Sequence, residues 1–187
     1  MAGRTRDPAR VNRSFAAEQR GVAVRMALAA VTTAIALGAG IAIAPDLGIA
    51  TLPDRIAFAL RCDVFVFVWV VAMIARIAAL RFFSPAEIDS SGTSTPSPQV
   101  TNARAVLQNT LEQVVIAAPA HLALATLLPA RMLVVVPIGV VLFGIGRALF
   151  WAGFARGAAA RAFGFALTFY PTVAASLAAV LLIVSQA

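Results

Sequence analysis

The sequence predicts an all-α integral membrane protein, and three observations lead to that fold class. Of its 187 residues, 61% are hydrophobic and only 12% are charged, whereas soluble domains carry roughly 45–50% and about 25%. A soluble chain of this composition would lack the polar side chains to cover its surface, and a disordered chain would not carry so much apolar surface. The apolar residues also fall into five long runs, separated by polar or proline-containing segments.

Residues 1–25 form a basic arm or a short amphipathic helix that contains six arginines, Arg4, Arg6, Arg10, Arg13, Arg20 and Arg25. The apolar run 26–44 follows and stops at Pro45. Such a run could be the core of a cleaved signal peptide, but both the run and the basic region before it are long for that role. We therefore interpret 26–44 as a retained transmembrane helix that is additional to the four spans that follow.

The four further spans are expected at about 56–80, 103–128, 132–150 and 162–184. Each span has roughly 19–25 residues, enough to cross a hydrocarbon core of ~30 Å at about 1.5 Å per residue. The segment 84–99, rich in Ser, Thr, Gly and Pro, predicts a long loop between the second and third spans. Pro119, Pro137 and Pro171 lie inside spans, where packed neighbours tolerate a proline.

The arginines are distributed unequally between the two ends of the predicted spans. With five spans, one side receives the arm, Arg76, the loop region 81–104 and the segment 147–161, while the other side keeps only Arg55, Arg61 and Arg131. The positive-inside rule then predicts a cytoplasmic N-terminus and an external C-terminus, in a bacterial inner membrane. This topology accounts for the net charge of +7, so we expect membrane lipids and no nucleic acid as partners.

The third span carries polar residues that a membrane helix should not expose. Arg104, Gln108, Asn109 and Glu112 fall within an arc of roughly 140°, and Gln113 lies at its edge. An ionised carboxylate in a span is costly, so we expect Glu112 to face the bundle interior and to pair with a cation. Two interpretations follow. The residues either form a cytoplasm-facing pocket for an anionic or zwitterionic ligand, or make an inter-helix ion pair that only holds the bundle together.

A second cluster lies at the end of the fourth span. Arg147, Phe150 and Phe154 share one helical face, and Arg161 begins the fifth span. The guanidinium group offers a rigid fork of donors that suits a carboxylate or a thiolate. We interpret Arg147 and Arg161 as ligand-binding residues, whereas Arg156 is typical of an arginine that extends to lipid phosphates.

Two single residues allow more than one interpretation. For His121, in the middle of the third span, an inter-helix hydrogen bond is favoured over a proton relay, because no carboxylate lies near it in the sequence. Glu112 is expected to be the only acidic residue deep in the bundle. Cys62 is the only cysteine, which excludes an intramolecular disulfide and a cysteine-rich metal cluster. We interpret it as a small buried apolar residue rather than a nucleophile, and no metal site is expected.

Two segments together resemble the MAPEG family, the membrane-associated proteins in eicosanoid and glutathione metabolism, in its bacterial form. The segment 109–113, Asn-Thr-Leu-Glu-Gln, is similar to the Asn-x-x-Glu of the family's second helix. The segment 146–154, followed by Arg161, is similar to the family's Arg-x-x-aromatic-x-x-Gly-aromatic element and its following arginine. The resemblance covers about residues 56–186 and implies a four-helix membrane domain, to which the helix 26–44 is an addition.

The resemblance also implies a function. It implies a homotrimer that binds glutathione, or a related low-molecular-weight thiol, as co-substrate between neighbouring protomers. Arg161 would be the catalytic residue, because a fixed cation lowers the thiol pKa and stabilises the thiolate. The thiolate would attack a lipophilic electrophile or reduce a lipid peroxide. The implied substrate-binding residues are Arg104, Asn109, Glu112, Gln113, Arg147, Phe150 and Phe154.

Two other functions stay open. Phe150 and Phe154 stand where active family members often carry tyrosine. A non-catalytic protein of the same fold, which binds lipid or a protein partner through the additional helix, is therefore an alternative. A small transporter or channel subunit that uses Glu112 and the arginines as an ion path is a third hypothesis.

Overall fold

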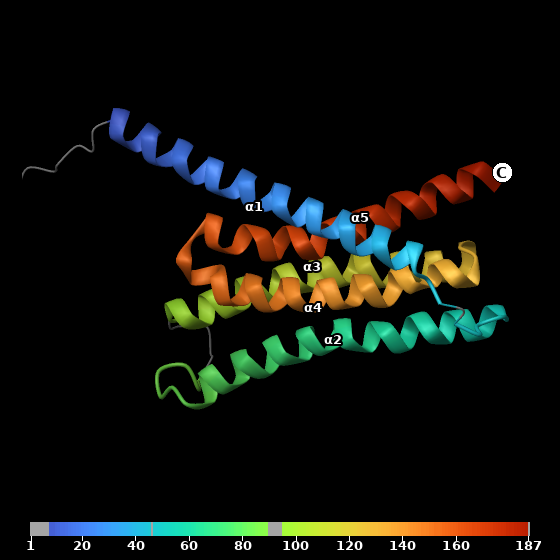
Figure 1. Ribbon diagram of the computed structural model, residues 1–187. Coiled ribbons are helices and arrows are strands. Elements are labelled where there is room, and N and C mark those ends of the chain that lie inside the picture. The colour runs from blue at the N-terminus through green and yellow to red at the C-terminus, as the bar shows by residue number, and fades with distance from the viewer. Residues whose placement is uncertain (1–7, 46, 90–94, 187) are drawn as a thin grey trace, which may run out of the picture.

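The computed structural model of the protein describes residues 8–45, 47–89 and 95–186, with side chains from residue 15 onward. Within these residues it has five long helices and no strand, which confirms the predicted all-α fold (Figure 1). All five are long and apolar enough to cross a membrane. The long helices are α1 (Pro8–Ala42), α2 (Leu52–Phe82), α3 (Pro98–Leu127), α4 (Val135–Gly153) and α5 (Ala158–Gln186), and short 3-10 helices at Ala130–Val134 and Phe154–Arg156 flank α4.

The helices α2 and α3 begin about one turn before the predicted spans, because each starts at a side-chain cap. The Thr51 hydroxyl accepts a hydrogen bond from the Asp54 N–H at 3.3 Å, and the Ser97 hydroxyl accepts one from the Val100 N–H at 3.3 Å. A proline stands in the first turn of each helix, where the missing N–H would have no helical partner. Capping chemistry thus extends both helices beyond their apolar runs.

Helix α1 joins the basic segment and the first apolar run. It passes from Pro8 to Ala42 without a break at residue 25, and its segment Phe15–Ala42 is long and apolar enough to span a membrane. Arg4 and Arg6 lie outside the described residues. The described part of the predicted arm is therefore helical and continuous with the additional transmembrane helix.

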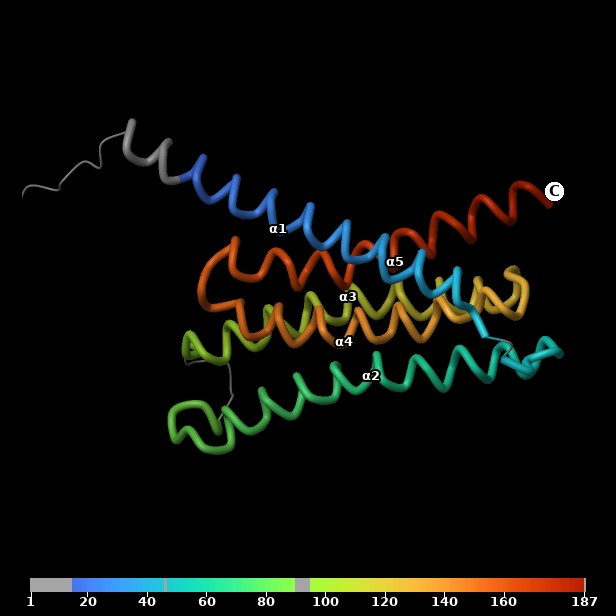
Figure 2. The backbone as a smooth tube through the Cα atoms, viewed as in Figure 1, coloured from blue at the N-terminus to red at the C-terminus, as the bar shows by residue number. Residues whose placement is uncertain are grey.

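The helices α2 to α5 form an antiparallel bundle, and α1 lies across α5 on the side away from α2 (Figure 1). The most extensive packing is between α4 and α5, between α2 and α3, and between α1 and α5. The start of α1 and the end of α5 lie at opposite ends of the bundle, as an odd number of spans requires (Figure 2). The additional helix is therefore packed on the bundle through α5.

Glycines bring α4 and α5 close together near one end of the bundle. A Cβ atom on Gly146 would lie 2.8 Å from the carbonyl oxygen of Gly164, and one on Gly153 would lie 2.8 Å from the carbonyl carbon of Ala160. Small residues at a helix crossing permit such an approach in membrane proteins. Gly157, with φ of 106°, provides the turn that leads into α5.

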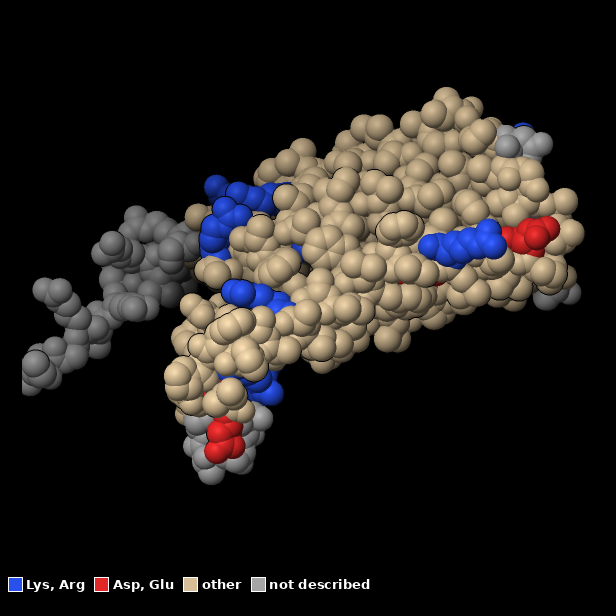
Figure 3. Space-filling model, turned by 90° about the horizontal axis from the view of Figure 1, so that it is seen from below, with Lys and Arg blue, Asp and Glu red and all other residues tan. Residues whose placement is uncertain are grey.

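Charged side chains lie towards the ends of the bundle, and on the face drawn in Figure 3 the surface between them carries almost none. Basic side chains gather at the end where α1 begins, where the helix ends carry Arg20, Arg25, Arg76, Arg81, Arg104, Arg156 and Arg161. The connections and helix ends on the other side carry Arg55, Arg61 and Arg131. The bundle therefore has one strongly basic end.

Candidate functional site

Arg147 of α4 is buried and joins three helices near the basic end. Its side chain is 1% exposed. Nε donates to the Thr168 hydroxyl of α5 at 3.1 Å, and Nη1 donates to Oδ1 of Asn109 on α3 at 2.8 Å. The guanidinium carbon also lies 4.6 Å from the centre of the Phe150 ring, a favourable cation–π arrangement. Nη2 has no hydrogen-bond partner among the described residues, so both N–H groups of this nitrogen are free.

A pocket of about 420 Å³ lies next to this arginine. Its lining residues are Val22, Met26, Asn109, Phe150, Phe154, Ala158, Arg161, Ala162 and Phe165. The Arg161 guanidinium stands 4.6 Å from the centre of the Phe154 ring, and the Phe150 and Phe154 rings meet edge to face at 5.4 Å. Arg161 has no ion pair or hydrogen bond within the described chain. The pocket therefore presents one uncompensated cation against apolar and aromatic walls.

The structure brings four of the predicted site residues to this pocket: Asn109, Phe150, Phe154 and Arg161. Arg147 stands behind it, in contact with Asn109 and Phe150. The other three predicted residues, Arg104, Glu112 and Gln113, do not line it. Gln113 is buried elsewhere in the bundle with its Oε1 unpaired, while Arg104 is exposed.

The expectation that Glu112 faces the bundle interior and pairs with a cation is wrong for the described part of a single chain. Glu112 is exposed. Its carboxylate accepts hydrogen bonds from the Gln108 amide at 3.1 Å and the Asn109 amide at 3.4 Å. The helical spacing that collects these residues into one polar stripe also turns Arg104, Gln108 and Glu112 outward. Only Asn109, at the edge of the stripe, reaches the pocket.

Sequence reasoning missed the contributions of α5 and α1 to the site. Thr168 carries the acceptor for Arg147, but a threonine inside an apolar run gives no sign of that role. Val22 and Met26 of α1 form part of the pocket wall. A carboxylate oxygen of Glu18 accepts a hydrogen bond from the Ala159 N–H at 2.9 Å, which ties α1 to the first turn of α5.

Residues 56–181 match the sequence model of the MAPEG family. The chain belongs to the MAPEG family. This match confirms the resemblance inferred from the segments 109–113 and 146–161, both of which lie within it. It begins in α2 and ends in α5, so it leaves α1 outside the MAPEG region. No curated protein and no solved structure matches the chain.

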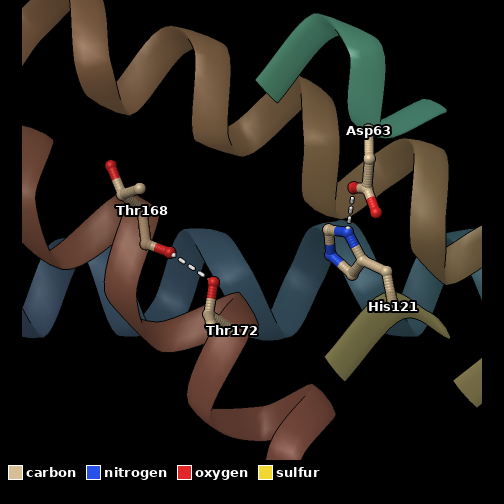
Figure 4. A network of polar contacts seen from close by, with 4 residues as sticks. All are labelled: Asp63, His121, Thr168 and Thr172. Atoms are coloured by element: carbon tan, nitrogen blue, oxygen red, sulfur yellow. Dashed lines mark hydrogen bonds and ion pairs between the residues drawn. The ribbon is translucent and has the colours of Figure 1, made fainter. Parts of the chain in front are cut away.

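A second buried polar group lies away from this pocket in the MAPEG bundle. His121 of α3 contacts Asp63 of α2 through Nδ1 and Oδ1 at 2.6 Å (Figure 4). The predicted inter-helix hydrogen bond of His121 is confirmed, although its partner is a carboxylate 58 residues away in the sequence. The expectation that Glu112 would be the only deep acidic residue is wrong, because Asp63 is 0% exposed. Cys62, next to it, is partly buried against the apolar core.

Proposed function

We propose that the protein is a membrane-embedded thiol transferase or peroxidase that acts on lipophilic electrophiles. The observation that supports this most is Arg161, whose unpaired guanidinium lines an apolar pocket at the basic end of the bundle. A fixed cation beside a thiol favours the thiolate. The thiolate sulfur would form a bond to an electrophilic carbon as the leaving group departs. Alternatively, it would attack the O–O bond of a lipid hydroperoxide, which releases the lipid alcohol and leaves a sulfenic acid that a second thiol converts to a disulfide and water. The proposed co-substrate is glutathione or a related small thiol.

The remaining residues would hold the charged ends of that thiol. Asn109, which lines the pocket, would bind a peptide group of the thiol, and Arg147, buried behind the pocket, would hold the Asn109 amide in position. Glu112 would bind an ammonium group, because its carboxylate is exposed and has no cationic partner within the described chain. Arg104, which is exposed on the same helix, would support this binding. Phe150 and Phe154 would cover the sulfur and the electrophile.

We further propose that the protein assembles as a homotrimer. Arg104, Gln108 and Glu112 form an exposed polar stripe along α3, and Glu112 lies near the middle of this candidate membrane span. Exposing the Glu112 carboxylate to lipid costs on the order of a few kcal/mol. A neighbouring copy that covers the stripe removes that cost, and a site shared between copies would then use Glu112.

The decisive experiment measures conjugation of glutathione to 1-chloro-2,4-dinitrobenzene by the protein in phospholipid vesicles. Arg161→Ala should lower kcat/KM by at least ~100-fold, in line with the loss of a charged group that stabilises a developing anion. Arg156→Ala is the matched control, because Arg156 is an exposed arginine nearby that does not line the pocket. Equal activity of the Arg161→Ala and Arg156→Ala variants would rule out the proposed role.

One observation favours a second candidate, a non-catalytic protein of the same fold that binds lipid or a protein partner. None of the residues that line the pocket carries a hydroxyl group, because phenylalanines stand at 150, 154 and 165. The pocket can thus hold a ligand, but none of its lining residues offers a hydroxyl group that could donate a hydrogen bond during thiol transfer. The absence of glutathione binding by calorimetry, together with the absence of turnover of any electrophile, would favour this alternative.

A further inference from the structure

A second pocket, of about 190 Å³, lies at the other end of the bundle from the arginine site. Its wall is built by α1, α3, α4, α5 and the turn after α3, and it shares no lining residue with the first pocket. Among the residues that line it, only His121 carries a polar side chain. The others are apolar, chiefly leucines, alanines and Ile41. This is the composition of a site for a small lipophilic ligand with one polar group.

The imidazole of His121 has one nitrogen engaged and one nitrogen free. Nδ1 contacts Asp63 at 2.6 Å. Nε2, on the other edge of the ring, points away from Asp63 (Figure 4) and has no hydrogen-bond partner among the described residues. It lies beside Gly139, where a Cβ atom would be 3.2 Å from it, and Gly139 also lines the pocket. The free nitrogen is therefore the polar group that the pocket offers.

The buried carboxylate determines which hydrogen-bonding role Nε2 plays. An isolated charge is costly in an apolar interior, so the pair is most stable when its net charge is zero. In one neutral arrangement Asp63 is ionised and His121 is protonated on both nitrogens. In the other, Asp63 keeps its proton and donates it to Nδ1, so the ring proton is on Nε2. In both arrangements Nε2 is a donor, and its partner must be an acceptor.

We propose that this pocket binds a compact lipophilic carbonyl compound, whose oxygen accepts a hydrogen bond from Nε2 of His121. A cavity of ~150 Å³ lined by apolar side chains holds benzene, so a pocket of about 190 Å³ suits one ring or a short chain with its carbonyl group. The pocket borders the surface where α1 meets α5, since Ile41 is 43% exposed. A ligand dissolved in the membrane can enter there. The site is independent of the thiol chemistry proposed above.

The experiment uses the full-length protein in phospholipid vesicles with acetophenone, a one-ring aromatic ketone that inserts into neighbouring C–H bonds when irradiated. We expect adducts in the peptides of α1 and α5 that contain Leu37, Ile41, Ala174 and Ala178. Octan-2-one should compete with labelling ~5-fold better than octane at equal concentration in the membrane, which corresponds to about 1 kcal/mol for the added hydrogen bond. Adducts confined to the lipid-facing side of α2, or equal competition by the two compounds, would overturn the proposal.

Two glycine variants of α4 isolate the hydrogen bond. Gly139→Ala puts a methyl group 3.2 Å from Nε2, so the advantage of the ketone over octane should fall to ~1-fold, with no hydrogen bond left to contribute. Gly144→Ala is the control, because its methyl group would make an ordinary 3.6 Å contact with Trp69 outside this pocket. An undiminished ketone advantage in Gly139→Ala would overturn the role of Nε2. If a variant does not fold, the comparison of octan-2-one with octane in the unsubstituted protein still tests the proposal.

Discussion

Arg147 on α4 and Asn109 on α3 are joined by a 2.8 Å hydrogen bond from Nη1 to Oδ1. The other side of the same guanidinium donates to Thr168 on α5 at 3.1 Å. One buried side chain therefore holds three helices in register beside the pocket. Because the guanidinium fork is rigid and planar, it sets the angle of the Asn109 amide as well as its distance.

We predict that Thr168→Val destabilises the protein by about 1–3 kcal/mol, because it leaves a buried N–H of Arg147 without an acceptor. Thr172→Val is the matched control on the same helix. The Thr172 hydroxyl donates only to the Thr168 carbonyl one turn earlier, so its loss should cost less than about 0.5 kcal/mol. Unfolding in detergent would measure both values. Equal destabilisation by the two substitutions would contradict this role of Thr168.

We predict that Glu18→Ala loosens the contact between α1 and α5. The Ala159 N–H would lose its acceptor at the start of α5, and removal of such a cap costs about 1 kcal/mol. The amide hydrogen of Ala159 should then exchange ~5-fold faster, which hydrogen-exchange mass spectrometry can follow. Glu18→Gln keeps an acceptor oxygen and should retain most of the protection. The role of Glu18 as acceptor is refuted if the Gln variant exchanges as fast as the Ala variant.

The contact between Glu87 and Ser97, which lie between α2 and α3, should loosen in acid. Hydrogen bonds from the Ser97 side chain and backbone lower the pKa of Glu87 below its usual value of 4.5, and the Ser97 N–H lies 2.8 Å from a Glu87 carboxylate oxygen. A lowered folded-state pKa stabilises the contact between Glu87 and Ser97 fully above pH 4.5, and this stabilisation is lost as the pH falls through the lowered value.

Hydrogen exchange at the Ser97 amide, corrected for its intrinsic rate, measures this loss between neutral and acidic pH. Glu87→Gln should abolish most of the pH dependence, because the amide does not titrate in this range. Asp89→Asn is the control, since Asp89 is an exposed acid in the same connection. An unchanged profile in Glu87→Gln would show that another group is responsible.

We predict that the basic end of the bundle faces the cytoplasm. In a Cys62→Ser background, Phe83→Cys at the basic end and Ile43→Cys at the opposite end introduce single thiols at sites that are 81% and 80% exposed. A membrane-impermeant maleimide should label Phe83→Cys in inside-out vesicles only, and Ile43→Cys in right-side-out vesicles only. The reverse labelling pattern would overturn the predicted orientation.

The helices could be predicted from the sequence because a run of apolar residues long enough to span a membrane can form few structures other than a transmembrane helix. Their starts were predicted less well, because the caps at Thr51 and Ser97 depend on individual hydrogen bonds. The continuity of α1 through residue 25 could not be read from hydropathy, since arginine is both a good helix former and a common residue of mobile arms.

Only part of the site could be predicted, because the sequence determines relations within one helix but not between helices. Helical spacing correctly placed Phe150 and Phe154 on the face of Arg147, because residues of one helix keep a fixed angular relation. Spacing says nothing about which way a helix is turned in the bundle, so Glu112 was expected inside and is found outside. The pairing of Asp63 with His121 could not be predicted from the sequence, because it joins residues 58 positions apart on different helices.

Helix α1 forms part of the wall of both pockets. Val22 and Met26 line the pocket beside Arg161, and Leu37 and Ile41 line the one beside His121, about 22 Å further along the same helix axis. An occupant of one pocket that shifts α1 must change the shape of the other. By thermodynamic reciprocity, the two ligands would then alter each other's affinity by the same factor. The helix outside the family region would in that case act as a mechanical link between opposite sides of the membrane.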